Sequence, residues 1–225
     1  MQRFEGKRVL VTSADTYMGP AIVKRFTEAG AAEVIADNGR YRLDPEEPAR
    51  IVAAAGDVDI LVVNLIPEQL AFKPATETVE DEWQAFFDAL VHPTMRFVKA
   101  VLPQMIARKE GKIIAVTSAI PLRGLEGSSS YSAARGAQNA YVRTVGSEVA
   151  RSNVQINAVA QGYVYGGFPD NALDDPAIRD AVMRDVPARR LAEGWEQADL
   201  VLFLASQSSN FISGQVMPFA GGWVT

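Results

Sequence analysis

The sequence contains no cysteine and one histidine, His92, among its 225 residues. Without cysteine, the chain forms neither a disulfide nor a thiolate metal site. A single histidine with no clustered partners is a poor metal ligand and a poor member of a Ser-His-Asp triad, so we assign His92 to helix packing. These absences lead us to expect no metal centre.

Long runs of one residue class are also missing. The net charge is −5 and no long basic run occurs, which argues against a nucleic-acid partner. No apolar run approaches the roughly 18 residues of a membrane span. The first residues lead directly to the apolar stretch at 8–11, with no secretory leader pattern ahead of it. We therefore expect a cytoplasmic protein, with no membrane partner and with one domain over residues 1–225.

Short apolar runs alternate with helical patterns. The strands predicted are 8–11, 33–36, 60–63, 112–117, 155–159 and 216–219. The helices predicted are 20–29, 46–55, 80–107 with a kink or break at Pro93, 132–151 and 197–205. This alternation predicts an α/β fold with a Rossmann-like, doubly wound parallel sheet in three α/β/α layers. The stretch between Asp37 and Asp59 is too short for the helix, strand and helix usual there, so the third strand is expected to be reduced or missing.

The turn after the first strand lacks glycines that a dinucleotide site needs. Residues 12–19 read Thr-Ser-Ala-Asp-Thr-Tyr-Met-Gly. They resemble the Thr-Gly-x-x-x-Gly-x-Gly pattern of short-chain dehydrogenases/reductases, with Ser13 and Tyr17 at the first two glycine positions and only Gly19 kept. A ring at Tyr17 occupies space that a pyrophosphate or nicotinamide requires. We expect no nucleotide cofactor, and a turn or capping role for Asp37. The alternative is a rearranged loop that still binds one.

Three polar residues form a candidate catalytic set. Ser118 ends a predicted strand, and Tyr131 follows thirteen residues later. Arg135 is four residues after Tyr131, so the two lie on one helix face, one turn apart. Strand ends of a doubly wound fold face the active-site crevice, where a loop can bring Tyr131 back across Ser118. Each residue alone is an ordinary turn or packing residue; the joint spacing is what indicates catalysis.

Ser118, Tyr131 and Arg135 resemble the catalytic set of the short-chain dehydrogenase/reductase family, which has lysine where this chain has Arg135. Arginine at that position together with an aromatic Tyr17 resembles the halohydrin dehalogenases, a cofactor-free branch. The resemblance implies closure of a vicinal haloalcohol to an epoxide plus halide, and the reverse opening of epoxides by small anions. Tyr131 is then the general base, Arg135 stabilises its phenolate and Ser118 holds the substrate oxygen.

The same resemblance implies a halide site after the fifth predicted strand. The backbone N–H groups of Tyr163 and Val164, with the Tyr17 ring, would hold the anion. Phe168 would form an apolar wall or lid, or would simply anchor the loop. The implied halide- and substrate-binding residues are Tyr17, Gln161, Gly162, Tyr163, Val164 and Phe168. Gln161 stands where the family usually has proline.

Two rival functions are open at this stage. One is an NAD(P)-dependent short-chain oxidoreductase with an atypical cofactor loop. Leu90 argues against it, because such oxidoreductases usually keep an asparagine there for a proton relay. The other is a non-catalytic protein on the same fold, which would not need Ser118, Tyr131 and Arg135 together. The resemblance further implies a homotetramer formed through the long helices at 80–107 and 132–151 and the last strand.

Overall fold

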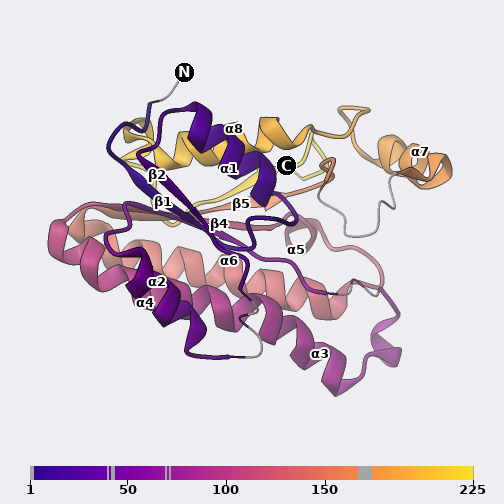
Figure 1. Cartoon of the computed structure of the whole chain (residues 1–225). Coiled ribbons are helices and arrows are strands. Elements are labelled where there is room, and N and C mark those ends of the chain that lie inside the picture. The colour runs from indigo at the N-terminus through magenta and orange to yellow at the C-terminus, as the bar shows by residue number, and fades with distance from the viewer. Residues whose placement is uncertain are drawn as a thin grey trace.

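The computed structural model describes residues 3–39, 41, 44–68, 70, 72–166 and 174–224. Its centre is a parallel sheet of six strands in the order β2-β1-β3-β4-β5-β6 (Figure 1). The strands are β1 (Arg8–Val11), β2 (Glu33–Ala36), β3 (Ile60–Asn64), β4 (Gly111–Ser118), β5 (Val154–Gln161) and β6 (Val216–Phe219). Each lies within about two residues of its predicted position, so the α/β class and the doubly wound sheet are confirmed.

Helices cover both faces of the sheet. They are α1 (Gly19–Glu28), α2 (Glu47–Ala55), α3 (Glu80–Phe86), α4 (His92–Arg108), α5 (Ile120–Arg123), α6 (Ser129–Val149), α7 (Pro176–Asp185) and α8 (Gly194–Ala205). Four single turns, η1 (Ala75–Glu77), η2 (Phe87–Val91), η3 (Ala150–Ser152) and η5 (Gln207–Ser209), complete the described elements. Helices α1 and α8 lie on one face, and α2, α4 and α6 on the other (Figure 1). Within the described ranges, no helix has the length and apolar character to cross a bilayer.

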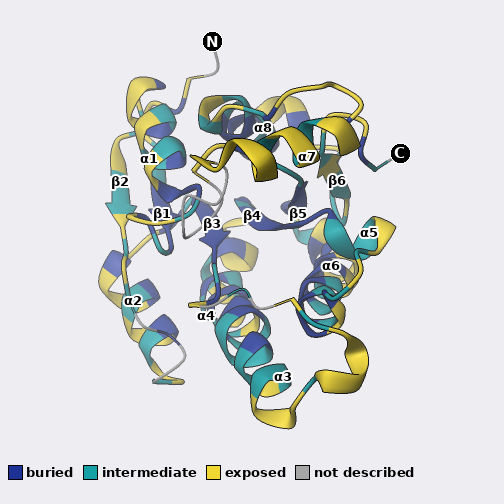
Figure 2. Cartoon of the chain, turned by 90° about the vertical axis from the view of Figure 1, so that its right-hand side faces the viewer, coloured by how far each residue is buried: buried dark blue, intermediate teal, exposed yellow. Residues whose placement is uncertain are grey.

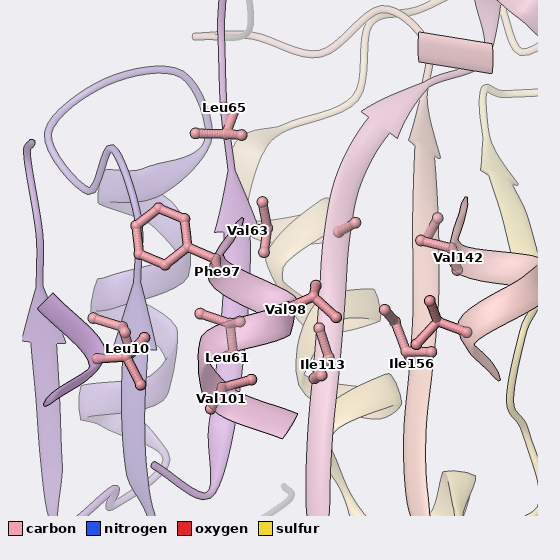
Figure 3. Packing of buried hydrophobic residues seen from close by; sticks show 14 of the residues in the cluster. Leu10, Leu61, Val63, Leu65, Phe97, Val98, Val101, Ile113, Val142 and Ile156 are labelled. Carbon is pink, nitrogen blue, oxygen red and sulfur yellow. The ribbon is translucent and has the colours of Figure 1, made fainter. Parts of the chain in front are cut away.

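Alternation along the strands divides the core into two layers. Leu10, Leu61 and Ile113 point toward α4 and α6, where Phe97, Val98 and Val101 of α4 meet them (Figure 3). Their chain neighbours, such as Val9 and Val62, pack on the opposite side under α1 and α8. Burial is therefore concentrated in the strands and on the inner faces of the helices (Figure 2). A sheet buried on both faces explains why its strands are nearly continuous apolar runs.

The segments on either side of β3 can be compared with the sequence predictions. Among the described residues between β2 and β3, helix α2 is present and no strand is seen, which agrees with the expected loss of the third strand. The helix predicted over 80–107, with a kink or break at Pro93, is found as α3, η2 and α4 in succession. The break is the π-helical turn η2, which precedes Pro93, and Pro93 itself lies in the first turn of α4. A proline there lacks only an N–H that the helix start does not need.

The strand order reverses next to β1, because β2 pairs with one side of β1 and β3 with the other. In open α/β sheets the crevice at the carboxyl ends of the strands beside such a reversal is the usual binding place. Four polar residues end or follow strands at this edge: Thr12, Asn64, Ser118 and Gln161. The candidate site is therefore at the carboxyl edge of β1, β3, β4 and β5.

Candidate active site

Arg135 is the centre of the site and is fully buried. Its Nε donates a hydrogen bond of 3.0 Å to the Tyr131 hydroxyl, one helical turn earlier on α6. One terminal nitrogen donates to the Val116 carbonyl at 3.1 Å and to the Gln138 side-chain oxygen at 3.0 Å. The other donates to the Leu65 carbonyl at 2.9 Å. These contacts join α6 to the ends of β3 and β4, and every one of these acceptors is formally neutral.

Tyr131 and Ser118 are both buried at this edge, as the sequence predicts. The Tyr131 ring packs against the rings of Phe86 and Phe72, with centroids 5.8 and 6.1 Å away. Ser118 ends β4, and its Oγ accepts a hydrogen bond of 3.1 Å from the Ile120 N–H. Among the described residues, no hydrogen bond joins Ser118 directly to Tyr131.

Tyr17 reaches the same place from the turn after β1. Its ring centroid lies 5.8 Å from the Arg135 guanidinium carbon, so the guanidinium lies near both the Tyr17 and Tyr131 rings. The residue as a whole is partly exposed, but its hydroxyl end is inside the protein. Burial raises the pKa of the Tyr17 hydroxyl above its ordinary value of 10.0, and the neighbouring Tyr131 raises it further against the opposing effect of Arg135. Tyr17 therefore stays a neutral hydroxyl near neutral pH.

The turn keeps a glycine-like backbone without the glycines. Ser13 and Tyr17 have φ values of 45° and 54°, in the left-handed region that non-glycine residues adopt only at a cost. Asn64 at the end of β3 fixes this path, because its side-chain nitrogen donates to the Ser13 and Thr16 carbonyls at 2.9 and 3.1 Å. At Gly19 a Cβ atom would lie 2.5 Å from the Ser13 carbonyl oxygen. Only glycine lets α1 start this close to the turn.

Three backbone donors of this turn are engaged within the chain. The N–H of Ser13 donates to the Tyr41 hydroxyl at 3.1 Å, that of Ala14 to the Asp37 carbonyl at 2.9 Å, and that of Asp15 to the Asn38 side chain at 2.9 Å. A pyrophosphate binds such turns through free backbone N–H groups. The engaged donors, together with the Tyr17 ring beside Arg135, argue against a nicotinamide dinucleotide at this turn.

Asp37 has the turn role expected of it. Its carboxylate accepts hydrogen bonds from the Tyr41 hydroxyl and from the Gly39 N–H. Tyr41 is buried, and its ring meets the Phe97 ring edge-on at 4.8 Å. Burial raises the pKa of the Tyr41 hydroxyl, and the bond to Asp37 raises it further, so Tyr41 remains a neutral hydrogen-bonding group. The carboxylate that would hold a ribose in a nucleotide site here braces the turn instead.

The predicted halide loop is partly built into the sheet. The Gly162 N–H donates to the Phe219 carbonyl at 2.9 Å, so this amide is not available to an anion. The Gln161 side-chain oxygen accepts a bond of 2.6 Å from Gln197 in the core. The amide of Val164 is different, because the residue is fully buried and its N–H donates no hydrogen bond within the described part of the chain. Val164 and Tyr17 belong to one hydrophobic cluster. Phe168 lies outside the described residues.

Tyr163 is anchored on the other side of this loop. Its ring meets the Trp223 ring at 5.4 Å, and burial, helped by the nearby Asp185, raises the pKa of its hydroxyl. Trp223 also donates to Asp185, which forms an ion pair of 2.7 Å with Arg123. The end of the chain therefore ties α5 and α7 to the loop after β5.

Several residues in this arrangement were not predicted from the sequence. Asn64 and Tyr41 shape the turn, and Gln138 and Thr94 hold Arg135 through a chain of hydrogen bonds. Two of them had a usable signal. Asn64 directly follows an apolar strand at the edge where sites form, and Gln138 is one helical turn beyond Arg135. Among the residues described, no group of His, Asp and Glu side chains is arranged to hold a metal ion.

Comparisons with known proteins agree with this geometry at the level of the family. The family model described as enoyl-(acyl carrier protein) reductase matches residues 46–224. The 3-oxoacyl-(acyl-carrier-protein) reductase FabG of Escherichia coli K12 is 30% identical, over 97% of this chain and 98% of its own length. A solved structure described as "Dehalogenation enzyme" is 28% identical with a TM-score of 0.90, covering 98% of this chain and 99% of the other.

A second solved structure is a gluconate 5-dehydrogenase from Burkholderia cenocepacia J2315, in complex with NADP and tartrate. It is 26% identical with a TM-score of 0.89, covering 98% of this chain and 96% of the other. A dehydrogenase and a dehalogenation enzyme are thus both similar to this chain in fold. The family match and the near full-length relatives establish that the chain belongs to the short-chain dehydrogenase/reductase family.

Proposed function

We propose that this chain is a halohydrin dehalogenase, a carbon–halide lyase that needs no nicotinamide. The observation that carries the proposal is the turn after β1, where the N–H groups of Ser13, Ala14 and Asp15 donate within the chain. Beside it, Ser118, Tyr131 and Arg135 are all present and buried. Similarity to a solved dehalogenation enzyme supports the same reading.

The reaction is an internal displacement. The Tyr131 phenolate accepts the proton of the substrate hydroxyl while Ser118 holds that oxygen by a hydrogen bond. The oxygen then forms a bond to the neighbouring carbon, the carbon–halogen bond breaks, and its electron pair leaves with the halide. Haloalcohol therefore gives epoxide, halide and one proton, which passes from Tyr131 to solvent. Holding the reacting groups in line is a large part of such a rate enhancement.

Arg135 supplies the electrostatic part of this scheme. A buried guanidinium is stable only when its charge is balanced, and its described acceptors are three carbonyl-type oxygens and the Tyr131 hydroxyl. Its positive charge is therefore available to an anion formed next to it. Ionisation of Tyr131 creates that anion at the atom that Nε already contacts.

The departing halide needs donors on the far side of the substrate. The proposed donors are backbone N–H groups of the loop after β5, among them the buried amide of Val164, and the Tyr17 side chain packs against the same hydrophobic cluster as Val164. Backbone donors favour an anion without adding a competing cation. The same donors would hold azide, cyanide or nitrite for the reverse opening of an epoxide.

Halide release from a small halopropanol tests the proposal. Release measured with a halide-selective electrode is expected to be equal with and without NAD(P)H. Tyr131→Phe is expected to lower the rate by about 10²–10⁴-fold, since general-base catalysis contributes that much. Tyr141→Phe, on the same helix, is the matched control and should keep the rate. Undiminished turnover by Tyr131→Phe contradicts the mechanism.

The second candidate is an NAD(P)-dependent oxidoreductase, which the reductase relatives favour. It predicts that NADPH raises the melting temperature of the protein and that no halide is released from a haloalcohol. The lyase predicts the opposite result in both assays, so one pair of measurements separates them. The homotetramer through α4 and α6 stays a prediction, for which light scattering in solution is the measurement.

A further inference from the structure

Behind Arg135 lies a buried chain of hydrogen bonds that the scheme above does not use. Arg135 donates to the Gln138 side-chain oxygen at 3.0 Å. The Gln138 nitrogen donates to the Leu90 carbonyl at 3.0 Å and to the Thr94 hydroxyl oxygen at 2.7 Å. Thr94 donates to the same carbonyl at 2.6 Å. Arg135, Gln138, Thr94 and Leu90 are at most 1% exposed.

The direction of this chain is determined by its two ends. A guanidinium only donates and a carbonyl only accepts, so the Gln138 oxygen must face Arg135 and its nitrogen must face Leu90. Both amide hydrogens and the amide oxygen of Gln138 then have partners, and so does the Thr94 hydroxyl. A fully satisfied buried network of this kind holds its members in one geometry.

The Leu90 carbonyl lies where the helical backbone is irregular. Leu90 is in the π-helical turn η2, immediately before α4, and its carbonyl accepts hydrogen bonds from the side chains of Gln138 and Thr94. The regular helical ladder is interrupted there, as is common for π-turns at functional sites. Leu90 stands where oxidoreductases of this family usually have a relay asparagine, and here its backbone oxygen anchors Gln138 instead.

We propose that Gln138 is a positioning residue, which fixes the Arg135 guanidinium through a neutral acceptor and so leaves its positive charge to the Tyr131 phenolate. The inference deepens the proposed function and rests on it for the reaction. A glutamate at position 138 would make the same contact but would add a negative charge. The neutrality of the amide, and not only its shape, is what the proposal requires.

The surroundings of Tyr131 and Arg135 contain few other charges. Tyr17 faces them from the turn after β1 and is held neutral by burial. Other described neighbours are uncharged: the Phe72 and Phe86 rings, Leu90 and Thr94 of η2 and α4, the Leu65 carbonyl just after β3 and the Val116 carbonyl of β4. A new carboxylate at position 138 would therefore dominate the local electrostatics.

The test is the pH profile of halide release by Gln138→Glu. In the proposed reaction the Tyr131 phenolate is the base, and a carboxylate that compensates Arg135 would stabilise this anion less than the neutral amide does. The midpoint of the pH profile is expected to move upward by about one pH unit or more. The matched control is Asn139→Asp on the same helix, because Asn139 is equally buried but bonds Thr117. Equal midpoints for Gln138→Glu and the wild type, or equal shifts in both variants, overturn the proposal.

A second measurement requires no substrate. Tyrosinate absorbance is titrated in the wild type and in Gln138→Glu, and in each case the titration of the same protein carrying Tyr131→Phe is subtracted. The remaining Tyr131 signal of Gln138→Glu is expected to show the same upward shift in its midpoint. If Gln138→Glu does not fold, Gln138→Met takes its place. It is expected to lower kcat about tenfold with KM unchanged, the effect of one hydrogen bond to a charged group. An unaltered kcat contradicts the proposal. If the Tyr131 midpoint shifts in Gln138→Glu as expected but the wild type releases no halide, the proposed function is refuted and the positioning role of Gln138 is not.

Discussion

Two regions at the carboxyl edge of the sheet differ in which features of the family pattern they retain. Beside the end of β4, Ser118 of that strand and Tyr131 and Arg135 of α6 match the residue pattern of the family's catalytic set, with arginine in place of lysine. At the end of β1 the opposite holds, because the backbone of the turn is kept and its side chains are changed. Ser13 and Tyr17 retain left-handed φ values of 45° and 54° although neither is glycine.

The difference shows which forces fix each region. Left-handed backbone costs a non-glycine residue about 1–2 kcal/mol, so the turn would relax if its surroundings allowed it. Asn64, Gly19 and Tyr41 hold it in place from β3, α1 and the segment after β2. The packing of the fold thus holds a left-handed path at positions 13 and 17 although neither residue is glycine. Function follows the side chains and not the fold.

The largest effect is expected from Arg135→Lys, which restores the usual family cation. One ammonium cannot reach the Tyr131 hydroxyl, the Val116 and Leu65 carbonyls and the Gln138 oxygen together. Halide release should fall by about 100-fold or more. At least one buried oxygen then accepts no hydrogen bond, so the free energy of unfolding should fall by about 2 kcal/mol, measured by urea denaturation.

Arg25→Lys is the control for this variant, because Arg25 lies partly exposed on α1 and pairs with Asp199. It should change neither quantity appreciably. Arg135→Lys with the wild-type rate would show that any cation serves and that the two sides of the edge are less different than we infer.

Gly19→Ala tests the turn with the next largest effect. The added Cβ lies 2.5 Å from the Ser13 carbonyl oxygen and 2.6 Å from backbone atoms of Ala14, which cannot move aside as a flexible side chain can. The free energy of unfolding is expected to fall by about 1–3 kcal/mol. Gly136→Ala is the control, since its Cβ would meet only the Pro121 side chain at 3.7 Å. Equal stability of the two variants would mean that the turn adapts easily.

What the sequence revealed depends on how local each signal is. β1 and β2 were predicted to the residue, because each is a short apolar run between turn residues. Helix α7 was missed, and none of its residues is buried in the structure. Helix α5 was missed because it is only four residues long. The π-turn η2 was missed because apolar residues continue through it.

The same distinction applies to the site. Tyr131 and Arg135 are four residues apart, so their pairing is visible in the sequence. The partners of Asn64 and Tyr41 are backbone groups of a turn about 50 and 30 residues away. No local pattern encodes such contacts, because they exist only once the strand order is known. Gly162 was expected to line the halide or substrate site, yet its N–H donates to the Phe219 carbonyl of β6, which is likewise distant in sequence.

Restoring both glycines sharpens the comparison at a smaller energetic cost. Ser13→Gly combined with Tyr17→Gly removes the left-handed strain but also removes the partly buried Tyr17 ring. The two effects oppose each other, and the free energy of unfolding should change by no more than about 1 kcal/mol. NADPH should still not raise the melting temperature, because Tyr41, Asp37 and Asn38 continue to occupy the amides. A clear NADPH-dependent increase would show that the side chains alone had closed the cofactor site.

The smallest expected effect concerns the start of α8, whose Gly194 packs on Met18 and Ala21 beside the turn. The Glu196 carboxylate accepts bonds from Arg190 at 2.6 and 2.7 Å and from the Glu193 N–H at 2.9 Å, which lower its pKa from 4.5 to about 2. A lowered pKa in the folded state stabilises the fold above about pH 4.5, and that contribution disappears as the pH falls toward 2. Glu196→Gln should therefore reduce stability at neutral pH by about 1 kcal/mol or less, since the pair is near the surface, and should flatten the acid limb of the stability profile.

Asp57→Asn, which breaks the exposed pair with Arg108, is the control and should leave that limb unchanged. If Glu196→Gln and the wild type have the same acid limb, the hydrogen bonds of Glu196 do not stabilise the start of α8 beside the turn.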